Sequence, residues 1–149
     1  MQRPARQYIQ TSGTFPVGTS YEPPRVLVAD DEPQILQVLT RVLRGAGIEV
    51  ETAESASEAL DLISALGFDV VITDLFVPDL GGAKVLAAVR LFDPLLPVVI
   101  ISGDTERRGS LDALDDAALY FLGKPVDSQQ LIDLVCELAG TRQAARATG

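Results

Sequence analysis

Five short apolar runs alternate with helical patterns along the chain, and this alternation restricts the fold more than any other feature. The runs begin at residues 25, 49, 69, 97 and 118, so neighbouring runs start about 20–28 residues apart. Between them, apolar residues recur at the spacing of a helix with one buried face. Strands that alternate with helices form βαβ units with right-handed crossovers. The sequence therefore predicts an α/β fold with an open, doubly wound sheet of parallel strands.

The composition of the runs predicts where each strand lies in the sheet. Four runs are continuously apolar, as is typical of parallel strands that helices cover on both faces. EVETA (49–53) alternates polar and apolar residues instead, so we expect it at an edge of the sheet. The predicted strands are RVLVA (25–29), EVETA (49–53), DVVIT (69–73), PVVII (97–101) and ALYFL (118–122).

A helical pattern follows each predicted strand. The fourth pattern, over roughly residues 105–116, is the weakest because Gly109 interrupts it. Ser55 and Glu58 match a capping box, which marks the start of the second helix. Cys136 falls in the last pattern, where we expect it to pack near the sheet. The five helices are predicted to begin at Pro33, after Ser55, at Gly82, near residue 105 and at Asp127. The first is predicted to face the sheet with Ile35, Val38, Leu39, Val42, Leu43 and Ala46.

Charge argues against two kinds of partner. The formal charge of the chain is −9; residues 1–24 carry +1 and residues 140–149 carry +2, which leaves −12 for residues 25–139. Direct nucleic-acid binding needs a basic face, which this acidic body does not offer. An anionic membrane surface would repel the acidic body as well. No apolar run approaches the roughly 20 residues that a helix needs to span a bilayer. We therefore expect no direct contact with nucleic acid or membrane.

The absence of histidine excludes further chemistry. Without it the chain has no Ser-His-Asp or Cys-His catalysis and no histidine metal site. The one cysteine, Cys136, cannot form an internal disulfide, so a reducing, cytoplasmic compartment is the simplest interpretation.

The two ends of the chain differ from its body. Residues 1–24 contain four prolines with scattered Gly, Ser and Thr, which predicts a flexible N-terminal arm. Alternatively, this arm docks on the body or on a second copy through the apolar side chains of Tyr8, Ile9, Phe15 and Tyr21. Residues 140–149 are predicted to be a tail or the start of a linker. The chain is then either a stand-alone domain, residues 25–139, or one domain excised from a longer protein.

Reactive side chains follow four of the five predicted strands. Asp30, Asp31 and Glu32 follow the first, Asp74 the third, Ser102 the fourth and Lys124 the fifth. Because the carboxyl ends of parallel strands share one rim of the sheet, we expect these side chains to lie together. An acid before Pro33 is also a normal helix start, but four such coincidences at one rim are not expected by chance.

The residue types indicate phosphoryl chemistry. Clustered carboxylates without His or Cys suit a hard cation with oxygen ligands, Mg²⁺ foremost. A carboxylate can attack phosphorus and form an aspartyl phosphate. Phosphoryl transfer needs positioning and charge neutralisation, which Mg²⁺ and a lysine supply.

These motifs resemble the receiver domain of bacterial two-component response regulators, the CheY-like family. The resemblance covers residues 25–139 and implies a five-stranded sheet of order 2-1-3-4-5 flanked by five helices. It is carried by Asp30-Asp31, the block DLFVPDLGG (74–82), Ser102 and Lys124-Pro125.

The resemblance also implies a role for each residue. Asp74 corresponds to the phosphoacceptor, and Lys124 to the lysine that contacts a phosphoryl oxygen and forms a cis peptide with Pro125. Ser102 corresponds to the switch hydroxyl, and Phe121 to the switch aromatic, although a plain core role is equally compatible with Phe121. The implied Mg²⁺ ligands are Asp30, Asp31, Asp74 and the backbone carbonyl of Phe76.

The expected function is therefore a phosphorylation-dependent signalling switch, a regulatory domain that catalyses only its own phosphorylation and dephosphorylation. The expected donor is a sensor histidine kinase or a histidine phosphotransfer protein. The expected output face, toward a downstream protein, an output domain or a second copy, comprises the fourth helix, fifth strand and fifth helix. A haloacid-dehalogenase-type phosphatase would need Asp-x-Asp after its first strand, and a flavin-binding flavodoxin-like protein would need a Ser/Thr/Gly-rich loop there; this chain has neither. A purely structural receiver is disfavoured by the complete acidic site.

Overall fold

The structure, a computed structural model, describes residues 22–74, 81–103 and 116–148. Its five strands form one parallel sheet of order β2-β1-β3-β4-β5. This is the predicted doubly wound α/β fold, with the alternating strand β2 at an edge as predicted. The strands are β1 (Arg25–Ala29), β2 (Glu49–Ala53), β3 (Val70–Asp74), β4 (Val98–Ser102) and β5 (Leu119–Gly123).

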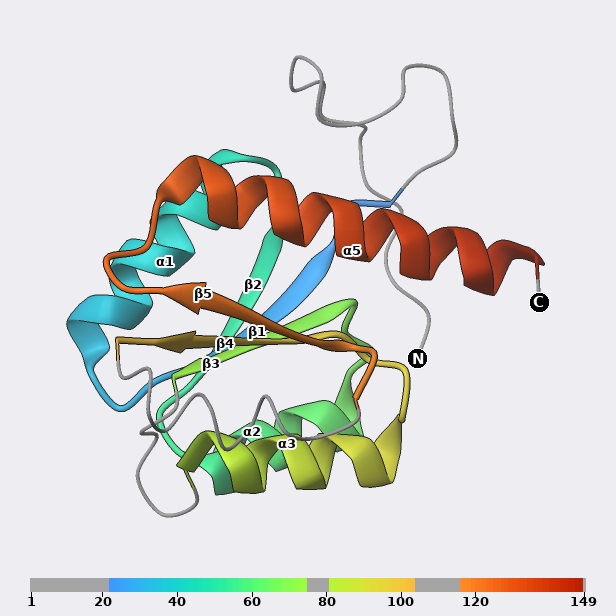
Figure 1. Cartoon of the computed structure of the whole chain (residues 1–149), viewed down its shortest axis with the longest axis horizontal. Coiled ribbons are helices and arrows are strands. Elements are labelled where there is room, and N and C mark those ends of the chain that lie inside the picture. Colours follow the sequence, from blue (N-terminus) through green and yellow to red (C-terminus); the bar gives the residue numbers. More distant parts are fainter. Residues whose placement is uncertain (1–21, 75–80, 104–115, 149) are drawn as a thin grey trace.

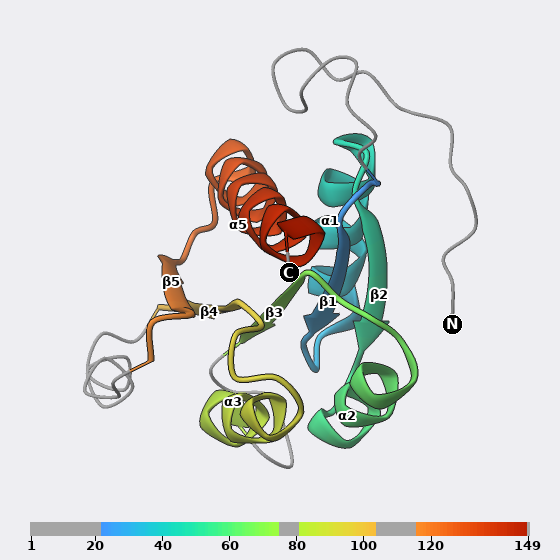
Figure 2. The ribbon, with the colours of Figure 1, turned by 90° about the vertical axis from the view of Figure 1, so that its right-hand side faces the viewer.

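The helices cover both faces of the sheet. Figures 1 and 2 show α1 and α5 on one face and α2 and α3 on the other. Within the described ranges the helices are α1 (Pro33–Gly45), α2 (Ala56–Ala65), α3 (Gly81–Phe92) and α5 (Ser128–Thr148). The predicted helix over roughly 105–116 lies almost wholly outside these ranges. The last helix runs on through residues predicted as a tail, and Figure 1 shows its end extending past the sheet.

Two layers of apolar side chains join the helices to the sheet. On the α1 and α5 face, Leu43, Leu131 and Val135 are fully buried against β1 and β3. On the other face, Val85 and Val89 of α3 are buried in the same way. Such burial contributes about 1.5–3 kcal/mol for each large aliphatic side chain.

The inward face of α1 differs from the prediction. Leu36, Leu39 and Leu43 are buried, whereas Ile35 is 37% and Val38 56% exposed. The buried residues follow i, i+3 and i+7, so they form a narrow stripe along one side of the helix. Ile35 and Val38 lie beside that stripe and are left on the surface. The apolar stripe predicted from the sequence is therefore wider than the part of the helix that the sheet covers.

The helix starts follow local sequence signals. The Ser55 hydroxyl accepts the N–H of Glu58 at 3.1 Å, as the predicted capping box requires. The Glu58 carboxylate accepts the backbone N–H of Glu54, whereas a standard capping box would use the N–H of Ser55. At the start of α5, an Asp127 carboxylate oxygen accepts the N–H of Gln130 at 2.9 Å. Cys136 lies half-buried in α5, and burial raises the pKa of its thiol to about 11.

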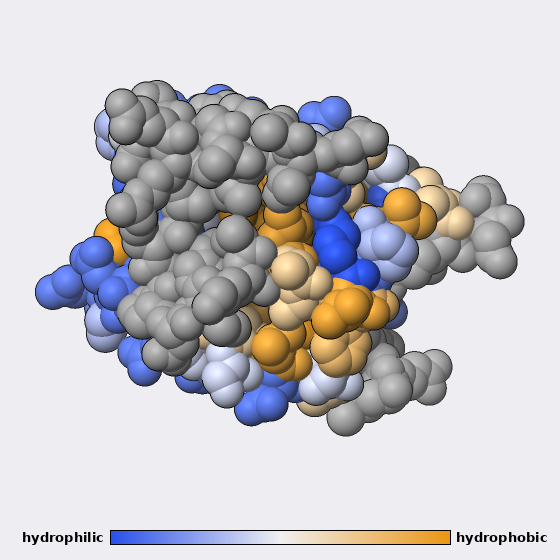
Figure 3. Space-filling view, turned by 60° about the horizontal axis from the view of Figure 1, so that its bottom comes forward, coloured by the Kyte–Doolittle hydropathy of each residue, from blue (hydrophilic) through white to orange (hydrophobic). Residues whose placement is uncertain are grey.

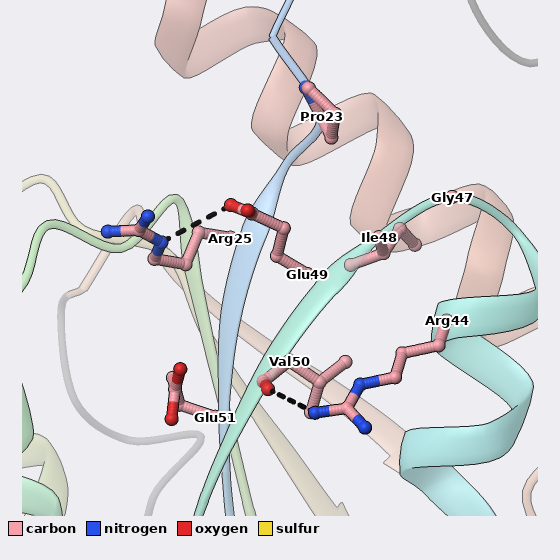
Figure 4. A pocket seen from close by; sticks show the side chains of 8 residues that line it. All are labelled: Pro23, Arg25, Arg44, Gly47, Ile48, Glu49, Val50 and Glu51. Atoms are coloured by element: carbon pink, nitrogen blue, oxygen red, sulfur yellow. Dashed lines mark hydrogen bonds and ion pairs between the residues drawn. The ribbon is translucent and has the colours of Figure 1, made fainter. Parts of the chain in front are cut away.

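Arginines fasten the edge strand β2 to its neighbours. Figure 4 shows Arg25 of β1 reaching the Glu49 carboxylate, and Arg44 of α1 donating to the carbonyl of Val50. A shallow hollow of about 340 Å³ lies between them. No helix in the described part of the chain is long and apolar enough to cross a membrane.

Arg90 ties α3 to the segment before β5. Its guanidinium donates to both carboxylate oxygens of Asp116, at 2.7 and 3.0 Å, and its remaining contacts are carbonyls of the loop after α3. The Arg90 guanidinium holds the pKa of Asp116 below its ordinary value, and the N–H of Ala118 acts in the same direction. This ion pair therefore fixes the end of α3 to the segment that leads into the edge strand β5.

Asp116→Asn is expected to lower the free energy of unfolding at pH 7 by about 1–3 kcal/mol, the range for a hydrogen bond to a charged group. A carboxyl whose pKa is depressed on folding stabilises the protein above its unfolded pKa and stops doing so as pH falls through its folded pKa. The deficit should therefore be complete above pH 4 and shrink below it. Urea titrations of both proteins across this range measure the difference. A deficit of unchanged size at the lowest pH would contradict the ion-pair explanation.

Candidate functional site

Four strand ends deliver the predicted side chains to one rim of the sheet. Asp74 is the last residue of β3 and Ser102 the last of β4, while Asp30 and Lys124 directly follow β1 and β5. These four strands are consecutive neighbours in the sheet. The register pairs Asp74 with Ile101 and Ser102 with Gly123, so the strand ends are level. The rim therefore gathers residues that lie up to 94 positions apart in the sequence.

Lys124 and Asp74 form the closest contact of the rim. The Lys124 ammonium nitrogen Nζ lies 2.5 Å from Asp74 Oδ2. The Asp74 side chain is only 9% exposed, whereas that of Lys124 is 45% exposed and reaches the carboxylate from the solvent side. Its hydrogen bond to Asp74 raises the pKa of Lys124; burial opposes this, and the negative charges of Asp74, Asp30 and Glu32 add to it. Lys124 is thus held as a cation beside a buried carboxylate.

Asp30 is a second buried carboxylate at the rim. It is 5% exposed, and its Oδ1 accepts the backbone N–H of Glu32 at 2.9 Å. Burial raises the pKa of Asp30 to about 6; the hydrogen bond from Glu32 opposes the increase, and the charges of Asp74 and Asp31 contribute to it. A nearby cation would stabilise the charged form of this buried carboxylate.

The acids after β1 form a donor set for such a cation. Carboxylate oxygens of Asp30, Asp31 and Glu32 lie within 4.8 Å of one another, with Asp31 and Glu32 exposed. Oxygen donors of this kind suit Mg²⁺, which keeps part of its water shell in proteins. Asp74 lies on the adjacent strand, β3. The predicted carbonyl ligand of Phe76 falls outside the described residues.

Glu32 contributes more than the sequence indicated. It was not among the implied Mg²⁺ ligands, and an acid before Pro33 is a normal helix start; its carbonyl does accept the N–H groups of Ile35 and Leu36. Its side chain makes no capping hydrogen bond and belongs to the acidic group instead. The run of three acids in DDEP was the only signal for this, and it is ambiguous because acids are common at helix starts.

Two further predicted residues flank the rim. Phe121 of β5 is half-buried against the apolar layer on the α2 and α3 side. Ser102 is placed by its backbone alone, through its pairing with Gly123. The peptide bond between Lys124 and Pro125 is cis.

An apolar groove adjoins the rim, and no sequence pattern indicated it directly. It holds about 310 Å³ and runs from Asp30 and Lys124 between α1 and the start of α5. Its lining includes Ile35 and Val38, the two residues of α1 that the fold leaves exposed. The remaining lining residues are Leu39, Val42, Ile101, Pro125, Val126, Ser128 and Leu131.

Comparison with known proteins places this site in a family. Residues 26–136 match the model of the response regulator receiver domain. The chain belongs to the response regulator receiver domain family. Receiver domains are regulatory modules of two-component systems, and the fold, the acidic group and the lysine of this chain agree with that assignment.

Individual relatives support the assignment. The chain is 32% identical over 108 residues to the DNA-binding transcriptional regulator NtrC of Klebsiella pneumoniae, covering 72% of this chain and 23% of NtrC. A receiver domain protein from Clostridium thermocellum superposes with a TM-score of 0.73 at 33% identity, covering 82% of this chain and 98% of that one. A bacterial protein described as a transiently phosphorylated signal-transduction switch gives a TM-score of 0.71 at 29% identity, covering 83% and 99%. The receiver spans about a quarter of the length of the curated relatives that it matches.

Proposed function

We propose that this receiver domain is a phosphorylation switch in which Asp74 accepts a phosphoryl group from a histidine of a partner protein. The observation that carries the proposal is the buried Asp74 carboxylate, 2.5 Å from Lys124 and beside the acids that follow β1. One of the similar solved structures is itself a transiently phosphorylated switch. With no histidine of its own, the chain relies on another protein or a small molecule as donor.

The reaction is an in-line displacement at phosphorus. A carboxylate oxygen of Asp74 attacks while the phosphorus–nitrogen bond of the donor breaks, and the electron pair of that bond stays on the donor imidazole. Lys124 Nζ, which donates to Asp74 Oδ2 before the reaction, neutralises charge on the phosphoryl oxygens after it. Asp30 and Asp31 would hold Mg²⁺, which supplies further positive charge when bound. The product is an aspartyl phosphate on β3.

The new charge then shifts a conformational equilibrium. Ser102 on β4 and Phe121 on β5 stand on the two strands that separate Asp74 from the sheet edge. A phosphoryl group that binds the Ser102 hydroxyl favours one of two conformations of the rim, and the position of the Phe121 ring changes with it. Strand β5 and helix α5 belong to the face that we propose for output.

Labelling of the unmodified protein tests the proposal. Incubation with radiolabelled acetyl phosphate and Mg²⁺ is expected to give one acid-stable, base-labile phosphoryl group per chain. Chelation of Mg²⁺ should abolish it, because the buried carboxylates then lack the charge that neutralises the incoming phosphate. Absence of label with Mg²⁺ present would overturn the switch.

The groove beside the rim supports a protein as donor. It places the exposed side chains of Ile35 and Val38 next to Asp30 and Lys124, so a helix that carries the phosphohistidine can bury them while its imidazole reaches Asp74. We propose that a sensor histidine kinase or phosphotransfer protein docks there. The curated relatives are much longer than this receiver, so we propose that residues 25–139 can act as the receiver module of a larger regulator. The phosphotransfer reaction would be the same in a stand-alone receiver.

Ile35→Ser with Val38→Ser is expected to slow phosphotransfer from the protein donor at least tenfold, since losing about 1.4 kcal/mol of apolar contact lowers affinity by that factor. Labelling by acetyl phosphate should stay unchanged, because Asp74 and Lys124 are untouched. The matched control is Leu91→Ser, which alters an apolar residue that is 89% exposed on α3. Equal loss with both donors would place the effect in the site itself and contradict docking at the groove.

A further inference from the structure

Helix α5 presents two kinds of side chain to the body of the protein. Its first part packs by apolar contact. The buried side chains there are Leu131, Val135, Leu138 and Ala139. The same helical spacing, carried one turn further, reaches Arg142 and Gln143. The face of α5 that meets the body is therefore apolar up to Ala139 and polar beyond it.

Gly140 lies where the two parts meet. Glycine weakens the interior of a helix, because it loses more conformational freedom on folding than any other residue. The residues from Gly140 to Thr148, which we call the distal segment, are also too few to form a stable helix alone in water. The helical structure of the distal segment therefore depends on its contacts with the rest of the protein.

Arg142 attaches the distal segment to the loop after α3. Its Nη2 donates to Asp93 Oδ2 at 2.5 Å, and Asp93 Oδ1 accepts the backbone N–H of Leu95 in the same loop. The Nε atom of Arg142 is buried and has no hydrogen-bond partner among the described residues. Because a buried donor without a partner costs free energy, this attachment is weaker than a fully hydrogen-bonded one.

Gln143 attaches the distal segment on its other flank. Its Nε2 donates to the carbonyl of Glu22 at 3.3 Å and to Asp69 Oδ2 at 3.4 Å. Both distances are longer than those of most N–H···O hydrogen bonds, so these contacts are weak. Glu22 and Asp69 precede β1 and β3, so Gln143 faces the opposite side of the helix from Asp93. Of the predicted N-terminal arm, residues 1–24, only residues 22–24 are described.

Arg90 holds the same loop more completely than Arg142 does. All three guanidinium nitrogens of Arg90 donate, two of them to Asp116 and one to the carbonyls of Asp93 and Leu96. Within the part of the chain that the structure describes, Arg142 donates through a single nitrogen. The loop is therefore fixed firmly to α3 and only lightly to α5.

The distal segment also lines a second groove. This groove holds about 580 Å³ at the opposite end of the sheet from the functional rim, and its lining includes Thr141, Arg142 and Ala145. Leu138, which is buried, and Leu95, which is 75% exposed, line it as well. Figure 3 shows further apolar surface on the side of the molecule that carries α3. Detachment of the distal segment would therefore open the groove and expose apolar surface.

We propose that the distal segment is a detachable part of α5, hinged at Gly140 and held by the polar contacts of Arg142 and Gln143. With these contacts closed, α5 is one continuous helix. When they open, the helix ends near Ala139 and the second groove loses part of its lining. The device lies at the far end of α5 from Asp74, so it does not depend on the proposed phosphorylation.

Hydrogen exchange of the full chain, followed by NMR in increasing urea, tests the proposal. The amides of residues 143–147 should exchange roughly a hundredfold faster than those of residues 133–139, because they open with the distal segment alone. Their exchange should depend little on urea, since a small opening exposes little surface. The change between the two classes should fall within the four residues after Ala139. Equal rates and equal urea dependence in both classes would overturn the proposal.

Substitutions distinguish a latched segment from a helix end that frays by itself. Asp93→Asn and, separately, Arg142→Gln should each speed exchange of residues 143–147 about tenfold, because each removes a hydrogen bond between charged groups. The double variant should speed it no more than either single one, since both break the same contact. Asp61→Asn removes an exposed acid on α2 and should change nothing. Unchanged exchange in the Asp93→Asn protein, or a hundredfold increase in the double variant, would show that this pair does not hold the segment and would overturn the proposal.

Discussion

Replacing Asp74 with Asn is expected to abolish phosphoryl labelling of the receiver by acetyl phosphate and Mg²⁺. The amide cannot act as the nucleophile, and the other acids of the rim follow β1, where their oxygens form the proposed cation site. Asn is nearly isosteric with Asp, and its amide oxygen can still accept the hydrogen bond that Lys124 donates to Asp74. The fold should therefore remain, and the loss should be at least a hundredfold, limited by the detection of label.

The control for this loss is Asp133→Asn, an exposed aspartate on α5. It should label as fast as the unmodified protein. Circular dichroism and urea titration of both variants establish that each is folded. Stoichiometric, base-labile label on the Asp74→Asn protein would mean that another carboxylate is the acceptor, and peptide mapping would then identify it.

Mg²⁺ is expected to stabilise the unmodified protein, and Asp31→Ala should lose most of that stabilisation. A ligand that binds only the folded state at a hundred times its Kd raises the free energy of unfolding by about 2.7 kcal/mol. Asp30, Asp31 and Glu32 repel one another without a cation, so binding relieves that repulsion as well. Removing Asp31 deletes one charged donor while leaving the buried Asp30 in place.

Thermal unfolding with and without Mg²⁺ measures this effect. Glu51→Ala removes an exposed acid in the middle of β2, outside the acidic group of the rim, and should keep the full Mg²⁺ response. Ca²⁺ and a matched concentration of monovalent salt separate specific binding from charge screening. An equal rise in Tm for the Asp31→Ala protein and the unmodified one would contradict the assigned site.

The sheet and its functional rim could be predicted because each depends on a local pattern. Every strand is a short run that differs from the helical stretches around it, and a parallel sheet brings the ends of such runs together whatever lies between them. Asp30, Asp74 and Lys124 could therefore be assigned to one rim from three separate places in the sequence. The alternation in EVETA also predicted the edge position of β2, because only an edge strand tolerates polar residues at every second position.

The surfaces could not be predicted in this way. Whether Ile35 or Leu36 faces the sheet depends on the rotation of α1 over β1 and β2, which packing decides and the helical period leaves open within about one residue. The pairs Arg142–Asp93 and Arg90–Asp116 link residues 49 and 26 positions apart, and no sequence signal selects one acid among the many in this chain. Both grooves arise from such choices.

Helix α5 lines the groove beside the functional rim and also a second groove, of about 580 Å³, at the opposite end of the sheet. Its 21 residues run as one element for about 30 Å, from Ser128 beside Lys124 and Pro125 to the turn that holds Arg142 and Gln143. Because the helix is continuous, a displacement of its first turn can be transmitted to its far end. If an occupant of each groove binds the same position of the helix more tightly, each raises the affinity of the other by the same factor. Two binding grooves of the receiver would then be coupled through one helix, and that coupling would be reciprocal.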